Sequence, residues 1–273
     1  MGRVEAIIGA LARGEPCSGL LAVMAHPDDE VLWIGAALAD REVALVHLTS
    51  GAPRDPFFAA QAGCAGEEAY AALRERELDA ALAVLGLAAA ARTTLGARDQ
   101  EAALSLTDLS RALAAFLVER RPSALIAHAY DGGHPDHDAT AFVARAAVLL
   151  ARRHVDPPAL IDAAGYHAGR AGLEVGFLRR PENERGATIA LSDMQRERKA
   201  RALACFASQR DVIARLDTSI ERLRPGARED FASAPHPGRL HYEEHGRPID
   251  GAAFRRHAEA AARALGVPLV LGW

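Results

Sequence analysis

Two short polar segments of this sequence hold histidines and carboxylates at spacings that suit metal chemistry. One reads His-Pro-Asp-Asp at positions 26–29, and the other reads His-Pro-Asp-His at positions 134–137. A catalytic zinc commonly takes three nitrogen or oxygen ligands from the protein and leaves one position open for water. His26 and Asp29 from the first segment, with His137 from the second, can supply such a ligand set.

The other polar residues of the two segments predict proton transfer. Asp28 is adjacent to the ligands but not needed among them, so we expect it to take a proton from the attacking water. His134 lies one turn before His137 and, as an imidazolium, would stabilise the oxyanion or protonate the departing amine. We expect Asp136 to orient a metal-binding histidine, as carboxylates beside such imidazoles often do.

Each segment follows an apolar run and precedes a helical pattern. Residues 20–25 are continuously apolar, and helical spacing resumes at 31–39, with Glu30 expected at the favourable helix N-terminus. Residues 124–130 form a second apolar run, followed by a helical pattern at 139–153. Ligands in α/β folds lie at the carboxyl ends of parallel strands, so both polar segments are expected at one rim of the sheet.

The rest of the chain continues this alternation and predicts an α/β fold with a mostly parallel sheet between helices. Further strands are predicted at 43–49, 159–166 and 188–191, and further helices at 67–85, at 108–119 behind a Thr107 cap, from Ser192 to about 207, and at 252–265. Residues 51–66 are expected to form a long loop. We predict one domain over 1–273, with a core at about 18–207 and an irregular and helical C-terminal elaboration at 208–273.

Composition and charge exclude several classes of function. The 273 residues are 50% hydrophobic and 25% charged, which is typical of a soluble globular protein. A net charge of -4 gives no attraction to polyanions, so nucleic-acid binding is not expected. No apolar stretch is long enough to span a membrane. The three cysteines form no CxxC pair, which favours a reducing cytoplasm over a disulfide framework.

A structural interpretation of each segment has to be weighed against the catalytic one. Histidine, proline and aspartate after a strand are ordinary turn residues, and a single such segment would more often be a turn. Two such segments, both at strand ends, favour a metal site over two turns. Each also holds more titratable groups than a turn needs, and such groups would repel or desolvate one another without a cation.

The two motifs identify a resemblance to a known family. Ala-His-Pro-Asp-Asp-Glu at 25–30 after one apolar strand, with Gly-His-Pro-Asp-His at 133–137 after a later one, resembles the LmbE-like or PIG-L family of zinc-dependent N-deacetylases. Its members act on N-acetylglucosaminyl compounds such as thiol precursors, glycolipids and glycopeptide antibiotics. The resemblance covers roughly the first two-thirds of the chain and weakens after about Tyr166.

The resemblance implies a Rossmann-like fold. It also implies that zinc is bound by His26, Asp29 and His137, with Asp28 as the general base and His134 as the electrostatic or acid partner. It further implies that Arg74, in an Arg-x-x-Glu pattern with Glu77, faces the substrate. Some members have an aromatic residue where this chain has Gly132, so we expect Tyr130 to take over its contribution to the oxyanion site. The loop at 51–66 and the segment at 235–238 are expected to select the substrate.

Several alternatives stay open on the sequence. The protein is expected to bind an N-acylated, sugar-like small molecule and to remove its acyl group, but a metal hydrolase of another amide or an ester has the same machinery. A non-catalytic sugar- or nucleotide-binding module is a third reading. A site of two histidines and one carboxylate also accepts Fe²⁺ in place of Zn²⁺. The C-terminal segment over the core leaves a homo-oligomer open.

Overall fold

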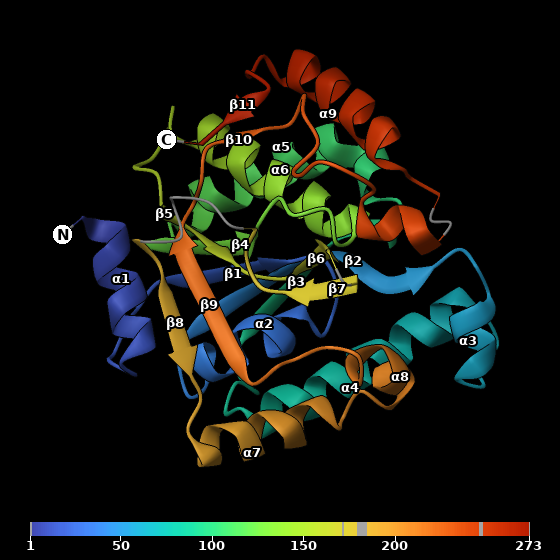
Figure 1. Cartoon of the computed structure of the whole chain (residues 1–273). Coiled ribbons are helices and arrows are strands. Elements are labelled where there is room, and N and C mark those ends of the chain that lie inside the picture. Colours follow the sequence, from blue (N-terminus) through green and yellow to red (C-terminus); the bar gives the residue numbers. More distant parts are fainter. Residues whose placement is uncertain (1, 171, 179–184, 246–247, 273) are drawn as a thin grey trace.

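The protein is organised around one central β-sheet with helices on both faces (Figure 1). The computed structural model describes residues 2–170, 172–178, 185–245 and 248–272. Within this part of the chain the sheet has seven strands in the order β3-β2-β1-β4-β5-β9-β8. Their bounds are Leu20–Met24 (β1), Val43–Pro53 (β2), Ala91–Asp99 (β3), Ala124–His128 (β4), Ala159–Ala163 (β5), Ala187–Ala190 (β8) and Ile220–Pro225 (β9).

The sheet is parallel where the predicted site lies. Five adjacent strands run parallel to one another, in the order β3-β2-β1-β4-β5. Strand β9 is antiparallel to both β5 and β8. From β1 the strand order proceeds one way to β2 and β3 and the other way to β4 and β5. The gap between the ends of β1 and β4 is therefore a topological switch point, where open α/β sheets bind their ligands. The expected mostly parallel α/β fold is confirmed.

Two hydrophobic clusters, one on each face, explain why the strand sequences are continuously apolar. In β1, Leu21 and Val23 pack into one cluster with α5, α6 and α9, whereas Leu20, Ala22 and Met24 pack into the other with α1, α2, α4 and α7. Figure 1 shows these two sets of helices on opposite sides of the sheet. The helix bounds are Arg3–Ala12 (α1), Asp29–Leu38 (α2), Glu67–Val84 (α4), Leu106–Arg120 (α5), Pro135–Ala151 (α6), Asp193–Leu203 (α7) and Gly251–Leu265 (α9).

Smaller elements surround the rim of the sheet. The segment at 51–66 is not the plain loop that was expected. Strand β2 continues to Pro53, and a short helix, α3 (Phe57–Gln61), follows it. The hairpin of β6 (Tyr166–Gly169) and β7 (Gly172–Val175) and the short helix α8 (Arg210–Ile213) follow later in the chain. Strands β10 (Glu229–Asp230) and β11 (Val270–Leu271) pair with each other.

Several local predictions were wrong. Helix α6 begins four residues earlier than predicted, so the second motif lies in its first turn and not in a loop. Thr107 lies inside α5, whose N-cap is Ser105, whereas Ser192 does cap α7, with a capping box. Strand β3 was not predicted at all.

The segment after residue 207 contributes to the central sheet and to the hydrophobic core. It supplies β9, which lies inside the central sheet between β5 and β8, and α9, which packs in the cluster with α5 and α6. The core thus takes in part of the region expected to be an elaboration. Among the described helices, none combines the length and apolar character needed to cross a bilayer.

Candidate active site

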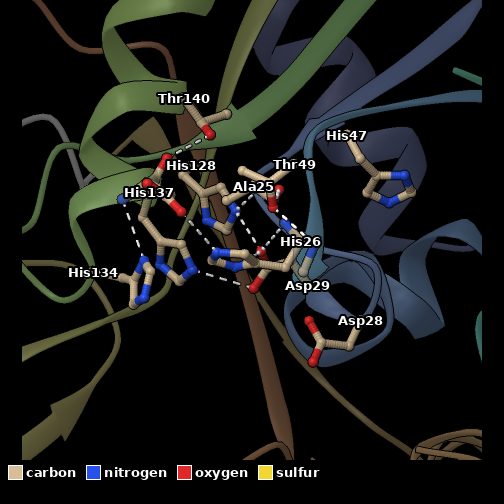
Figure 2. A network of polar contacts seen from close by, with 12 residues as sticks. Ala25, His26, Asp28, Asp29, His47, Thr49, His128, His134, His137 and Thr140 are labelled. Atoms are coloured by element: carbon tan, nitrogen blue, oxygen red, sulfur yellow. Dashed lines mark hydrogen bonds and ion pairs between the residues drawn. The ribbon is translucent and has the colours of Figure 1, made fainter. Parts of the chain in front are cut away.

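The fold brings the two motifs together at the rim of the sheet. Strands β1 and β4 are direct parallel neighbours, and the motifs follow their carboxyl ends. The imidazole of His26, just after β1, lies with its centroid 5.6 Å from that of His137, in the first turn of α6. Figure 2 shows His26, Asp29, His128 and His137 converging on one small volume. The expectation that both segments share one rim is therefore confirmed.

The carboxylate of Asp29 is the centre of this group. Its Oδ2 lies 3.1 Å from His26 Nδ1 and accepts a hydrogen bond from the His26 amide, while its Oδ1 lies 3.3 Å from His137 Nε2. The indole Nε1 of Trp33 also donates to Oδ1, at 3.0 Å. Burial alone would raise the pKa of Asp29, but His137 and His128 hold it well below its usual range. Asp29 is therefore a buried anion among imidazoles.

The second nitrogen of His26 faces a different carboxylate. His26 Nε2 lies 3.2 Å from Asp136 Oδ2 and 3.0 Å from Asp99 Oδ1. Asp136 is held in turn by the backbone amides of Gln100, at 2.6 Å, and Ala102, at 3.1 Å. Burial lowers the pKa of His26, but Asp99, Asp136 and Asp29 together raise it well above its usual value. Asp136 lies where a residue that orients His26 from behind should be.

The donor atoms of these residues are close enough to share a cation. Donor atoms lie within 4.8 Å of one another in each of four groups: His26, His134 and His137; His26, Asp99, His134 and Asp136; Asp29, His128 and His137; and His26, Asp28 and Asp29. Each pair within the expected ligand set of His26, Asp29 and His137 occurs in one of these groups. Imidazole nitrogens and a carboxylate in a buried pocket suit Zn²⁺ and Fe²⁺. None of these groups holds all three expected ligands, so the donor chemistry fits a metal site at this rim and the exact ligand set stays a prediction.

Asp28 lies beside this group and is held by Arg74. The Arg74 Nη2 donates to Asp28 Oδ2 at 2.9 Å, from a guanidinium that is only 2% exposed. The Nε and Nη1 groups of Arg74 have no hydrogen-bond partner in the described part of the chain. Both residues line a small cavity at the rim of the sheet, which we call the catalytic cavity. Arg74 is thus a buried residue of the cavity wall, paired with Asp28.

Gly51 leaves room for Arg74 to reach Asp28. Its φ of +68° lies in the left-handed region, and a Cβ there would come within 2.9 Å of Pro27 Cδ and 3.0 Å of Arg74 Nε. Only glycine combines that backbone conformation with such a close approach.

His134 is the N-cap of α6. Its Nδ1 accepts a hydrogen bond from the Asp136 amide at 3.2 Å, so the lone pair of that nitrogen is used and the proton of the neutral ring lies on Nε2. The ring packs edge-on against His26, with centroids 4.7 Å apart, and lines the catalytic cavity. The capping bond favours a neutral His134 that donates from Nε2, in place of the imidazolium suggested by the sequence.

The expectation for Tyr130 was wrong. Its hydroxyl donates to the carbonyl of Ser233 at 2.8 Å, and its ring packs on Phe231 in the core, away from the cavity. Tyr166, at the start of β6, lines the cavity and contacts His137, with ring centroids 5.5 Å apart. At Gly132 a φ of +77° and the side chain of Leu240, 2.8 Å from an ideal Cβ, leave no room for the aromatic residue that some relatives carry there.

Two buried histidines, His128 and His47, and Glu30 complete the surroundings of the site. The ring of His128, at the end of β4, stacks on His137 with centroids 3.9 Å apart, and its Nε2 lies 3.2 Å from Asp29 Oδ2. Burial and the charge of His137 lower the pKa of His128 to about 4, so the ring is neutral. Glu30 is buried in the first turn of α2, with His47 Nε2 3.1 Å from its Oε1.

Apolar periodicity explains what was missed. His47 and His128 lie within apolar strands and are buried, so the strand pattern alone does not distinguish a core histidine from one that supports the site. Asp99 belongs to the edge strand β3, whose mostly exposed residues carry no apolar pattern.

The catalytic cavity is small, at about 90 Å³. The segment at 51–66 contributes Gly51, Pro53 and Phe58 to its lining. The segment at 235–238 contributes nothing to it and packs instead beside Gly132, where His236 Nε2 lies 3.2 Å from an ideal Cβ. Of the two segments expected to select substrate, the first alone reaches this cavity.

Comparison with known proteins agrees with this geometry. The family model described as "PIG-L: GlcNAc-PI de-N-acetylase" matches residues 21–148, which include both motifs. A 1D-myo-inositol 2-acetamido-2-deoxy-alpha-D-glucopyranoside deacetylase of Nakamurella multipartita is 32% identical over 71% of this chain and 80% of its own. A second enzyme of that name, from Catenulispora acidiphila, is 35% identical over 50% of this chain and 53% of its own.

A solved structure supports the fold. A deacetylase of the teicoplanin biosynthetic pathway, crystallised as a triple mutant, aligns with a TM-score of 0.56 and 21% identity over 76% of this chain and 96% of its own. That likeness concerns the fold alone. The identity to the N. multipartita enzyme over most of its length, together with the two motifs at one rim, decides the family: the chain belongs to the PIG-L, or LmbE-like, family of deacetylases.

Proposed function

We propose that this protein is a zinc-dependent hydrolase that removes the N-acetyl group from a glucosamine-type substrate. The observation that carries the proposal is the Asp29 carboxylate between His26 and His137, with Asp28 beside it at the rim of the sheet. Membership of a deacetylase family supports it, as does the 2-acetamido sugar named as the substrate of the N. multipartita relative.

In this proposal His26, Asp29 and His137 hold the metal ion, with Asp136 orienting His26. Zinc supplies a Lewis acid that lowers the pKa of water and polarises the amide carbonyl. Fe²⁺ suits the same donor set, so metal identity belongs to the test.

Asp28 takes the proton of the attacking water, and Arg74 fixes its carboxylate for that role through the 2.9 Å contact. His134 donates from Nε2 to the oxyanion, because its Nδ1 is held by the Asp136 amide. As the C–N bond breaks, the proton taken by Asp28 passes to the departing nitrogen, and acetate and a free amine result. Arg74, which lines the cavity, also faces the substrate in this proposal.

The test is acetate release from N-acetylglucosaminides by the zinc-loaded protein and by Asp28→Asn and His137→Ala variants. Asp28→Asn is expected to keep its metal and lose at least about a hundredfold in kcat, within the usual range for a general base. His137→Ala is expected to lose metal as well. Full activity in both folded variants would exclude the assignment. Equal activity towards simple esters would favour a different metal hydrolase, and binding without turnover would favour a sugar-binding module.

A further inference from the structure

A second, larger cavity adjoins the catalytic one. It measures about 730 Å³, and we call it the vestibule. Its walls come from α3, the region of α8, the β6–β7 hairpin and the 3-10 turn His241–His245. The two cavities are adjacent, because both are lined by His134, Tyr166, Phe58, Val212 and Leu216. A group bound in the vestibule therefore lies next to the residues proposed to act on the amide.

The vestibule has an unusual concentration of exposed apolar side chains. Phe57 on α3 is 61% exposed and Val212 on α8 is 44% exposed, and both line this cavity. They are two of the five large hydrophobic residues exposed in the described part of the chain. Exposed apolar groups gathered at a cavity mark a binding surface more often than scattered ones do. Leu173 and Leu216 extend the apolar wall.

Four charged residues line the vestibule. Arg210, Asp211 and Arg215 line it, and so does Glu77. The Glu77 carboxylate accepts hydrogen bonds from both the amide and the hydroxyl of Ser208, at 2.8 Å and 2.6 Å. Those bonds tie Glu77 to the wall.

The two cavities differ in volume and therefore suit different parts of a substrate. Pockets for small molecules commonly measure about 300–1,000 Å³, a range that contains the vestibule and excludes the catalytic cavity. The small catalytic cavity suits an acetamido group and the sugar atoms next to it. An acetyl group is too small to fill the vestibule, which leaves this volume to the group attached to the sugar.

We infer that the substrate is an N-acetylglucosaminide whose aglycone carries an aromatic or alkyl group, and that the vestibule binds this aglycone between Phe57 and Val212. The inference rests on the proposed function and adds a substrate class to it. A polyol aglycone would leave the apolar walls exposed to water, whereas an aryl ring would cover them.

The experiment compares kcat/KM for acetate release among N-acetylglucosaminides with methyl, inositol, phenyl and 4-methylumbelliferyl aglycones, in both anomers. We expect the aryl glycosides to exceed the methyl and inositol glycosides by about tenfold or more. The double variant Phe57→Ser, Val212→Ser should reduce this ratio to about twofold. Met194→Ser is the matched control, because Met194 is 78% exposed on α7 and lines neither cavity. It should keep the full ratio.

Three results would overturn the inference: equal kcat/KM for methyl and aryl glycosides, a higher value for the inositol glycoside, or an aryl preference that survives the double variant. A series of N-acyl chain lengths on the methyl glycoside tests the other source of an apolar group. If activity rises with acyl length and not with the aglycone, the vestibule holds the acyl chain and the inference fails.

Failure of the proposed function gives a different pattern. If no glycoside releases acetate, calorimetry with phenyl and methyl glucosaminides still measures the preference of the vestibule. About tenfold tighter binding of the phenyl compound, lost in the double variant, would support the vestibule as an apolar subsite. Equal affinities would exclude it.

Discussion

Asp136 Oδ2 lies 3.2 Å from Nε2 of His26, although 110 residues separate the two in the chain. Nδ1 of His26 faces Asp29, and in the proposed site the contact with Asp136 orients the His26 ring for the metal. The two backbone amides that bind Asp136 keep its carboxylate in place.

Asp136→Asn is therefore expected to weaken zinc binding by about 10- to 100-fold, because an amide orients the His26 ring less firmly than a carboxylate does. The measurement is zinc affinity by competition with a chromogenic chelator. Asp108→Asn, at a side chain 87% exposed, is the control and should bind zinc as the parent protein does. Unchanged affinity in Asp136→Asn would mean that Asp99 alone orients His26.

His128 is expected to position Asp29, since it lies 3.2 Å from Oδ2 and stacks on His137. His128→Ala should lower zinc affinity about tenfold or more, and His128→Asn should restore part of it, because an amide can still donate to the carboxylate. His154→Ala, at an exposed histidine, is the matched control. If the two His128 variants lose the same stability but bind zinc normally, the residue serves packing alone.

Zinc is expected to stabilise the folded protein, because a buried anion among imidazoles gains a partner when a cation binds. At a free zinc concentration of 100 times Kd the gain is about 2.7 kcal/mol in the free energy of unfolding. Chelator-treated protein should therefore show a higher Tm after zinc is added, whereas Asp29→Asn and His137→Ala should show little change. A zinc-dependent rise of equal size in both variants would place the metal elsewhere.

The buried pair of His47 and Glu30 predicts a pH-dependent contribution to stability. Burial lowers the pKa of His47, but the Glu30 carboxylate raises it above its usual value. The contribution is fully present below the unfolded pKa of about 6.5 and is lost as pH rises through the raised folded pKa.

His47→Gln should accordingly cost roughly 3–5 kcal/mol near pH 6, where it leaves a buried charge without its partner, and less at pH 9. Urea unfolding at several pH values measures this difference, with His154→Gln as the exposed control. A cost that stays constant from pH 6 to pH 9 would show that the pair does not titrate in this range.

The sequence by itself determined the class of fold and the location of the site. The apolar runs at 20–25 and 124–130, each followed by a polar segment and a helical pattern, predict strands buried on both faces, and polar segments after parallel strands meet at one rim. Those two rules depend on local pattern and general topology. They were enough to bring His26, Asp29 and His137 to one rim, whereas Arg74 on α4 was implied only by the resemblance to the family.

Tertiary structure alone decided the partners of these residues. Asp99 comes from an exposed edge strand without a periodic pattern, and β9 enters the sheet from a segment with no strand signal. Tyr130 and Tyr166 each follow an apolar strand, yet the first packs in the core and the second lines the cavity. Which residues pair depends on strand order and register, and these are fixed by packing across the whole sheet, beyond the reach of any local pattern.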